Sequence, residues 1–230
     1  MGLRMNILVA CEESQEVCKA FRARGHRAFS CDIQQCSGGH PEWHITGDVL
    51  PLLNGDCTFQ TADTHTHTQV GRWDLIIAHP PCTYLTNAGA ARLFRNVHDG
   101  DFQMINIRRL KEGIKARDLF LAMLNADCDK IAVENPIPSS IFCLPQYSQC
   151  IQPYEYGHPF LKKTCLWLKG LPPLFPTEIV QPKGSWVSGG SKKSQRRTET
   201  KQRGNIQRCI YKEQNISRNR QSDGRSMGVR

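Results

Sequence analysis

The chain has 230 residues, which suits one ordinary domain, and no apolar run approaches the roughly 18 residues of a membrane-spanning helix. The chain has eleven cysteines, and no two of them form a CxxC pair. This spacing argues against a disulfide framework or a zinc ribbon. The N-terminus shows no apolar core of a signal peptide, so we expect a cytoplasmic protein.

The net charge of +9 is concentrated at the C-terminal end. Residues 192–230 hold twelve Lys and Arg against three acids, so the rest of the chain is neutral. Such a basic tail attracts phosphate through counterion release. The alternative is a disordered end that keeps the protein in solution.

The first segments predict a parallel sheet. Residues 5–11 are typical of a buried strand, 12–24 of an amphipathic helix, and 26–31 of a second strand. Strand, helix and strand in this order form a βαβ unit. A short apolar run at 43–45 follows, close to Asp48.

Residues 54–72 have the turn residues and alternation of an exposed β-hairpin. His65 and His67 offer two metal ligands, but without a third ligand an exposed hairpin arm is the simpler interpretation. A second metal pattern consists of two cysteines and two histidines with a spacing loosely like a zinc knuckle: Cys31, Cys36, His40 and His44. Because Cys31 falls within a predicted strand, we expect no metal there.

The apolar run 73–79 predicts a further buried strand, which the Pro80-Pro81 turn ends before Cys82. The remaining segments are an irregular loop at 83–101, a crossover helix at 104–124, a strand at 130–133, an irregular segment at 136–160 and a strand at 164–168. We therefore predict a single α/β domain, residues 1–182, with a mostly parallel Rossmann-like sheet and a β-hairpin insertion. Residues 183–230 form the predicted basic tail.

Cys82 and Glu134 each follow a predicted buried strand, at the edge where open α/β sheets hold their chemistry. A thiolate and a carboxylic acid together can activate carbon 5 of a pyrimidine. The thiolate adds to carbon 6 while the acid protonates N3.

The order of these motifs resembles the C5-cytosine DNA methyltransferase family, especially its short phage- and prophage-borne members, over roughly residues 5–175. Pro81-Cys82 matches the nucleophile motif, and Glu134-Asn135 matches the motif that contacts the cytosine. The segment 156–168 is similar to the one that supplies a basic residue, here Lys163, although lysines and a phenylalanine replace the usual glutamine and arginine.

The resemblance implies S-adenosylmethionine as methyl donor, held at the ends of the first strands. The positions it assigns to donor binding are Ala10, Cys11, Glu12, Ser14, Asp32, Ile33, Asp48 and Pro80. Asp32 fits the ribose hydroxyls and Asp48 the adenine amino group. The first turn reads Ala-Cys-Glu-Glu-Ser where the family has Gly-x-Gly.

The resemblance also implies a C-terminal helix that closes the fold. The sequence after residue 190 shows no amphipathic segment that predicts such a helix. A frame shift near 195–201 is one hypothesis for this difference, and translation in the other frames tests it. The predicted function is methylation of cytosine C5 in double-stranded DNA, in a bacterial or phage-infected cell. Two alternatives stay open: a nucleobase-modifying enzyme with another donor, and a DNA-binding protein without activity. The target sequence and the oligomeric state do not follow from the sequence.

Overall fold

The computed structural model describes residues 3–63, 67–96 and 103–185. Its centre is a seven-stranded sheet with the strand order β10-β12-β9-β6-β1-β2-β3. The five strands from β9 to β3 are mutually parallel, whereas β12 runs antiparallel to both of its neighbours. The mostly parallel α/β sheet that the sequence predicts is therefore confirmed, and the antiparallel β12 makes it a mixed sheet.

The sheet strands lie close to their predicted positions, with one addition. They are β1 (Asn6–Ala10), β2 (Arg27–Asp32), β3 (His44–Thr46), β6 (Leu75–Ala78), β9 (Ile131–Pro136), β10 (Gln149–Ile151) and β12 (Thr164–Lys169). Strand β10 falls within the segment that we expected to be irregular.

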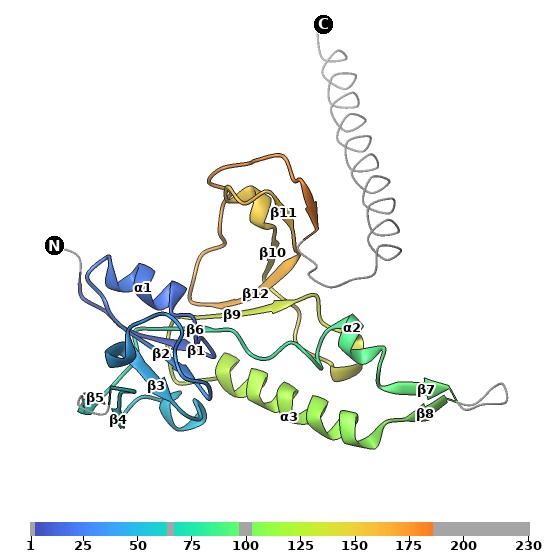
Figure 1. Cartoon of the computed structure of the whole chain (residues 1–230), viewed down its shortest axis with the longest axis horizontal. Coiled ribbons are helices and arrows are strands. Elements are labelled where there is room, and N and C mark those ends of the chain that lie inside the picture. Colours follow the sequence, from blue (N-terminus) through green and yellow to red (C-terminus); the bar gives the residue numbers. More distant parts are fainter. Residues whose placement is uncertain (1–2, 64–66, 97–102, 186–230) are drawn as a thin grey trace, which may run out of the picture.

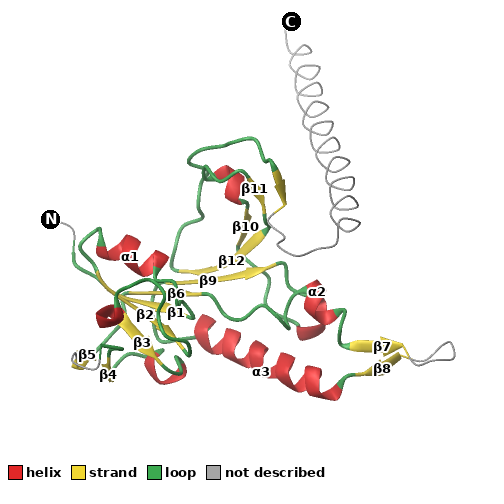
Figure 2. Ribbon diagram, viewed as in Figure 1, coloured by secondary structure: helices red, strands yellow, loops and turns green. Residues whose placement is uncertain are grey.

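Helices cover both faces of the sheet (Figure 1, Figure 2). Helix α1 (Glu16–Arg22) packs Cys18 against Ile7 and Val9 on one face. Helix α3 (Ile107–Leu124) packs Phe120 and Met123 on the other face. No helix in the described part of the chain has the length and apolar character needed to cross a bilayer.

Within the part of the chain that the structure describes, three two-stranded sheets extend this core. The predicted hairpin is present as β4 (Cys57–Gln60) and β5 (His67–Val70), and its alternation buries Phe59 and Val70 in the main core. It is therefore half-buried rather than a free arm. His65 lies outside the described residues.

The other two small sheets were not predicted. The expected loop at 83–101 contains α2 (Asn87–Ala90) and β7 (Phe94–Asn96), and β7 pairs with β8 (Gln103–Ile105). Strand β11 (Phe160–Leu161) pairs with β13 (Gly184–Ser185), so the first residues assigned to the tail pair with the domain. The rest of the predicted tail lies outside the described residues.

Short 3-10 helices link several of these strands. They are η1 (Pro41–Trp43), η2 (Leu50–Leu52), η3 (Ser140–Phe142) and η4 (Pro153–Glu155).

Candidate active site

The carboxyl ends of the five parallel strands meet at one edge of the sheet. Two main-chain bonds continue the ladder past the strand ends: His79 N–H donates to the carbonyl of Ala10, and Glu12 N–H donates to the carbonyl of Cys31. Because the predicted nucleophile, carboxylate and donor positions all follow these strands, the topology brings them to the same edge.

Cys82 lies in an exposed turn that begins at a buried proline. Pro80 is buried, whereas Pro81 and Cys82 are exposed. The main-chain N–H groups of Leu85 and Thr86 donate to the Cys82 carbonyl at 3.2 and 3.3 Å. The thiol is therefore accessible while its main chain is fixed.

Glu134 lies within β9 rather than after it. The pairing of β9 with β6 ends at Val133, but β12 continues alongside, placing Leu166 opposite Glu134 and Cys165 opposite Asn135. The apolar run that predicts the strand stops one residue earlier. The carboxylate is thus held by regular sheet bonding, on the strand next to the one that leads to Cys82.

Asn135 joins these two strands. Its side chain is fully buried, and its Nδ2 donates to the carbonyl of Pro80 at 3.3 Å. Its Oδ1 has no hydrogen-bond partner among the described residues. Asn135 therefore ties the start of the Cys82 turn to the Glu134 strand.

His79 is a neighbour of Glu134 that sequence reasoning missed. Its Nδ1 lies 3.7 Å from Glu134 Oε2, and its buried Nε2 lacks a partner among the described residues. A signal was available, since His79 is a titratable residue between an apolar strand and the Pro-Pro turn. His79 follows Ala78, and Glu134 follows Val133, the residue opposite Ala78 in the pairing of β6 with β9.

Arg109 is a second residue that the sequence did not single out. From α3, its guanidinium donates to the carbonyls of Gly89 and Thr83, both at 3.1 Å, and lies over the Tyr84 ring. A Cβ at Gly89 would lie 2.1 Å from the Thr83 oxygen, so only glycine fits there. Arg109 therefore holds the segment that follows Cys82 as a compact turn.

Lys163, the predicted basic residue, is exposed and directly precedes β12. Burial and then the neighbouring Cys150 and Glu134 raise the pKa of Cys165 to about 12, while Lys163 opposes this shift. Lys163 and Glu134 thus both act electrostatically on the same thiol. The lysine lies in the region of the candidate carboxylate.

Two of the predicted donor positions, Asp32 and Asp48, lie near a third, Cys11. Burial, followed by the charges of Asp32 and Asp48, raises the pKa of the Cys11 thiol to about 12. The two carboxylates from β2 and from the turn after β3 therefore lie near the end of β1. Each uses an oxygen to accept a nearby main-chain N–H, from Gln34 and Leu50 respectively.

Ile33, beside Asp32, is 80 % exposed and is free to cover a flat ligand. Ala10 is fully buried and offers only its main chain, whose carbonyl accepts from His79. Pro80 is buried in the same region and accepts from Asn135.

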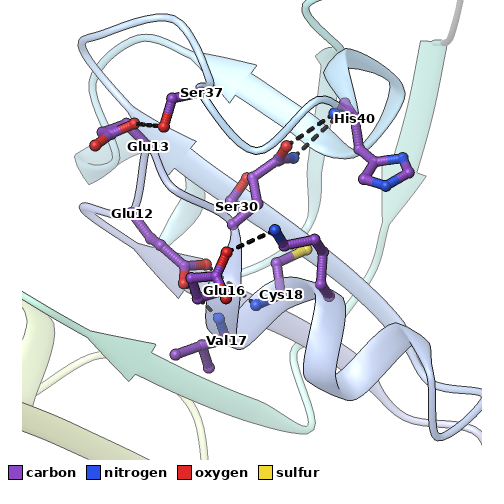
Figure 3. Close-up of polar contacts among 10 residues, drawn as sticks. Glu12, Glu13, Glu16, Val17, Cys18, Ser30, Ser37 and His40 are labelled. Atoms are coloured by element: carbon purple, nitrogen blue, oxygen red, sulfur yellow. Dashed lines mark hydrogen bonds and ion pairs between the residues drawn. The ribbon is translucent and has the colours of Figure 1, made fainter.

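Glu12 lies differently from the other donor positions (Figure 3). Its buried carboxylate accepts the N–H groups of Val17 and Cys18 at 2.6 and 3.1 Å. An acidic group at a helix N-terminus satisfies free N–H groups and the helix dipole. The carboxylate of Glu12 is therefore bound to α1 rather than open toward a ligand.

The loop after β2 is fastened to the turn after β1. Gln15, at φ 60°, binds the main chain of His40 through both ends of its amide, and Glu13 accepts from Ser37 (Figure 3). A Cβ at Gly38 would lie 2.4 Å from the Ser14 carbonyl, so this close contact requires glycine. The main-chain carbonyl of Ser14 therefore packs directly against Gly38 at this edge of the sheet.

The two histidines of the zinc-knuckle-like pattern have separate partners. His44 is buried and bonds Ser30 and the Gln34 carbonyl, whereas His40 stacks on Trp43 and faces Glu42. Among the described residues no group of three or more His, Cys, Asp or Glu side chains is arranged to hold a metal ion.

Comparison of the chain with models of known protein families gives no match. A comparison with curated protein sequences gives none either.

Proposed function

We propose that this protein is an S-adenosylmethionine-dependent DNA methyltransferase that acts on carbon 5 of cytosine. One observation carries the proposal. Adjacent parallel strands bring an exposed cysteine turn and a carboxylate to one sheet edge, and Asn135 bonds the two segments together.

The residues divide the reaction between them. The Cys82 thiolate forms a bond to C6 of the base while Glu134 transfers its proton to N3, so the negative charge moves from sulfur to the carboxylate. Carbon 5 then becomes nucleophilic and takes the methyl group of the donor, whose sulfur–methyl bond breaks and whose sulfur leaves as a neutral thioether. Loss of the C5 proton to a base restores the C5–C6 double bond and expels Cys82 as the thiolate, and the N3 proton returns to the carboxylate of Glu134.

The donor supplies an activated methyl group, and the residues near Cys11 suit it. Asp32 and Asp48 offer acceptors for ribose hydroxyls and an adenine amino group, and Ile33 offers an apolar surface. The order of the sheet, with one antiparallel strand beside β9, is compatible with a methyltransferase-type fold.

Double-stranded DNA is the proposed partner. Arg108 and Lys111 are exposed on α3, the helix that also supplies Arg109, and residues 192–230 carry the surplus of basic residues. These groups suit phosphate contacts, so binding should weaken steeply with salt. The target cytosine must leave the base stack to reach Cys82.

The decisive experiment is covalent trapping of the full chain on a duplex that contains 5-fluorocytosine, with S-adenosylmethionine present. Fluorine cannot be lost as a proton is, so the adduct should persist, and mass spectrometry should locate it on Cys82. A control duplex with ordinary cytosine should release the protein. Absence of any adduct on duplexes of varied sequence would contradict the proposal.

One observation favours a related enzyme with another donor. The carboxylate of Glu12 caps α1, where the family's Gly-x-Gly turn lets the main chain approach the ligand. Calorimetry with S-adenosylmethionine and with other one-carbon donors separates the two functions. Saturable binding of S-adenosylmethionine, and of no other donor, supports the methyltransferase.

A further inference from the structure

His79 and Glu134 lie side by side on neighbouring strands. In the parallel register of β6 and β9, Ala78 is opposite Val133, so the next pair along the strands is His79 and Glu134. Successive side chains alternate between the faces of a sheet, so both members of this pair point to the same face. Their side chains are 30 % and 24 % exposed, and Nδ1 lies 3.7 Å from Oε2.

The surroundings of the imidazole indicate which nitrogen carries the proton. Nε2 is buried and has no hydrogen-bond partner among the described residues. An N–H group buried without an acceptor costs about 1–3 kcal/mol. A neutral ring that carries its proton on Nδ1 directs that N–H at the carboxyl group of Glu134, whereas a proton on Nε2 would leave an N–H without an acceptor and turn the Nδ1 lone pair toward a carboxyl oxygen.

We propose that His79 is a positioning residue for Glu134. Its Nδ1–H orients the carboxyl group and stabilises the carboxylate that remains after Glu134 has given its proton to N3 of the base. This inference rests on the proposed function for the identity of that base. An approach of less than about 1 Å brings the two atoms into hydrogen-bond distance, and catalytic contacts commonly tighten in this way when substrate binds.

The interaction strengthens as the reaction proceeds. Before the transfer, Nδ1–H faces a neutral acid; afterwards, it faces a carboxylate that carries the charge formerly on sulfur. A hydrogen bond to an ionised acceptor is about twice as strong as one between neutral groups. Stabilisation that appears only along the reaction accelerates the chemical step and leaves substrate affinity unchanged.

Two substitutions separate this role from packing. In His79→Asn the side-chain amide keeps an N–H group close to the position of Nδ1, whereas His79→Leu fills similar space without a donor. At saturating fluorocytosine duplex we expect His79→Leu to slow adduct formation by about 10- to 100-fold and to leave the DNA dissociation constant unchanged. His79→Asn should stay within about fivefold of the unsubstituted chain. Equal rates for the two variants would overturn the inference.

A spectroscopic measurement tests the pair without reference to catalysis. Nitrogen-15 NMR of the histidine ring nitrogens in the full chain should show His79 protonated at Nδ1. Glu134→Ala should change the His79 ring signals, whereas Cys82→Ser should not. Ring signals that are identical with and without Glu134 would overturn the inference, whatever the enzyme's activity.

The two measurements also distinguish this inference from the proposed function. If the ring signals respond to Glu134 but the unsubstituted chain forms no adduct, the proposed function fails and takes the positioning role with it. If the adduct forms and His79→Leu does not slow it, only the role of His79 fails.

Discussion

Cys11 and Cys82 both follow a buried strand, yet their surroundings give them different chemistry. Burial and two nearby carboxylates raise the pKa of Cys11 to about 12, so its thiol stays protonated at neutral pH. Cys82 is exposed on the turn between β6 and α2. Since the thiolate is the nucleophile, Cys11 is suited to lining a pocket, and Cys82 is the better candidate for covalent chemistry.

Replacement of the candidate nucleophile is the direct prediction at this scale. Cys82→Ser should reduce methyl transfer by more than about 10³-fold, because a serine hydroxyl has no base of its own here to activate it. The loss follows from the far weaker ionisation of a hydroxyl than of a thiol. Donor binding should persist, because the residues around Cys11 are unchanged. Tritium incorporation into DNA and calorimetry measure the two properties.

Cys143→Ser, at another exposed cysteine, is the matched control and should keep both properties. Methyl transfer that survives in Cys82→Ser would refute the covalent mechanism.

At the scale of elements, the segment after Cys82 is held by bonds from two directions. Arg109 of α3 binds the carbonyls of Thr83 and Gly89. From the other side, the Ser139 N–H donates to the carbonyl of Leu85, which is fully buried. The turn that carries the thiol is thereby fixed to the helix and to the segment that follows β9.

Arg109→Ala should loosen this turn and slow adduct formation by about tenfold or more, because small displacements of a reacting group are costly. Arg109→Lys should restore little of the lost rate, since a single ammonium group cannot replace the planar guanidinium that donates to two carbonyls at once. Single-turnover trapping at saturating DNA measures the effect, and thermal unfolding verifies that the fold remains.

Lys115→Ala removes an exposed cation from the same helix and serves as the control. If Arg109→Ala and Lys115→Ala trap DNA equally fast, Arg109 does not position the turn.

The sequence predicted the parallel core well, because β1, β6 and the first half of β9 are apolar runs with clear stops, and the helical pattern between β1 and β2 marks a βαβ unit. It missed β10, whose residues Gln149–Ile151 become a strand only by pairing with β12. It also ended β9 too early, since Glu134 and Asn135 are polar and owe their strand geometry to that same partner. Cys82, Glu134 and Asn135 were accessible through their motifs, whereas His79 and Arg109 act through contacts between distant segments.

At the scale of the whole molecule, the interior contains several thiols that resist ionisation. Burial is the main reason that the pKa of Cys18 is raised to about 11 and the pKa of Cys31 to about 12. It is also the main reason for the raised pKa of Cys11. In the unfolded chain these thiols would ionise near pH 9. The unfolded state therefore loses protons that the folded state retains as the pH rises above 9.

Because the folded pKa values are the higher ones, this contribution to stability is complete below pH 9 and is lost as the pH rises toward 11 to 12. Under reducing conditions, the free energy of unfolding should fall between pH 9 and pH 10 by roughly 1 kcal/mol for each such thiol. Urea denaturation at the two pH values measures the change. Cys18→Ala should reduce the fall, whereas Cys143→Ser, at an exposed site, should not; an unaltered fall in Cys18→Ala would contradict this account.

The adjacency of β6 and β9 has a consequence for how such a protein can diverge. The spacing of the thiol turn and the carboxylate is set by two hydrogen-bonded strands, not by the chain that connects them. Apart from Gly89 and Arg109, which hold the turn, that connection with its small hairpin and long helix can lengthen, shorten or change in sequence while the reacting groups stay in register. Distant homologues would then share little beyond these two residues and two short motifs, His-Pro-Pro-Cys and Glu-Asn, each at the end of an apolar run.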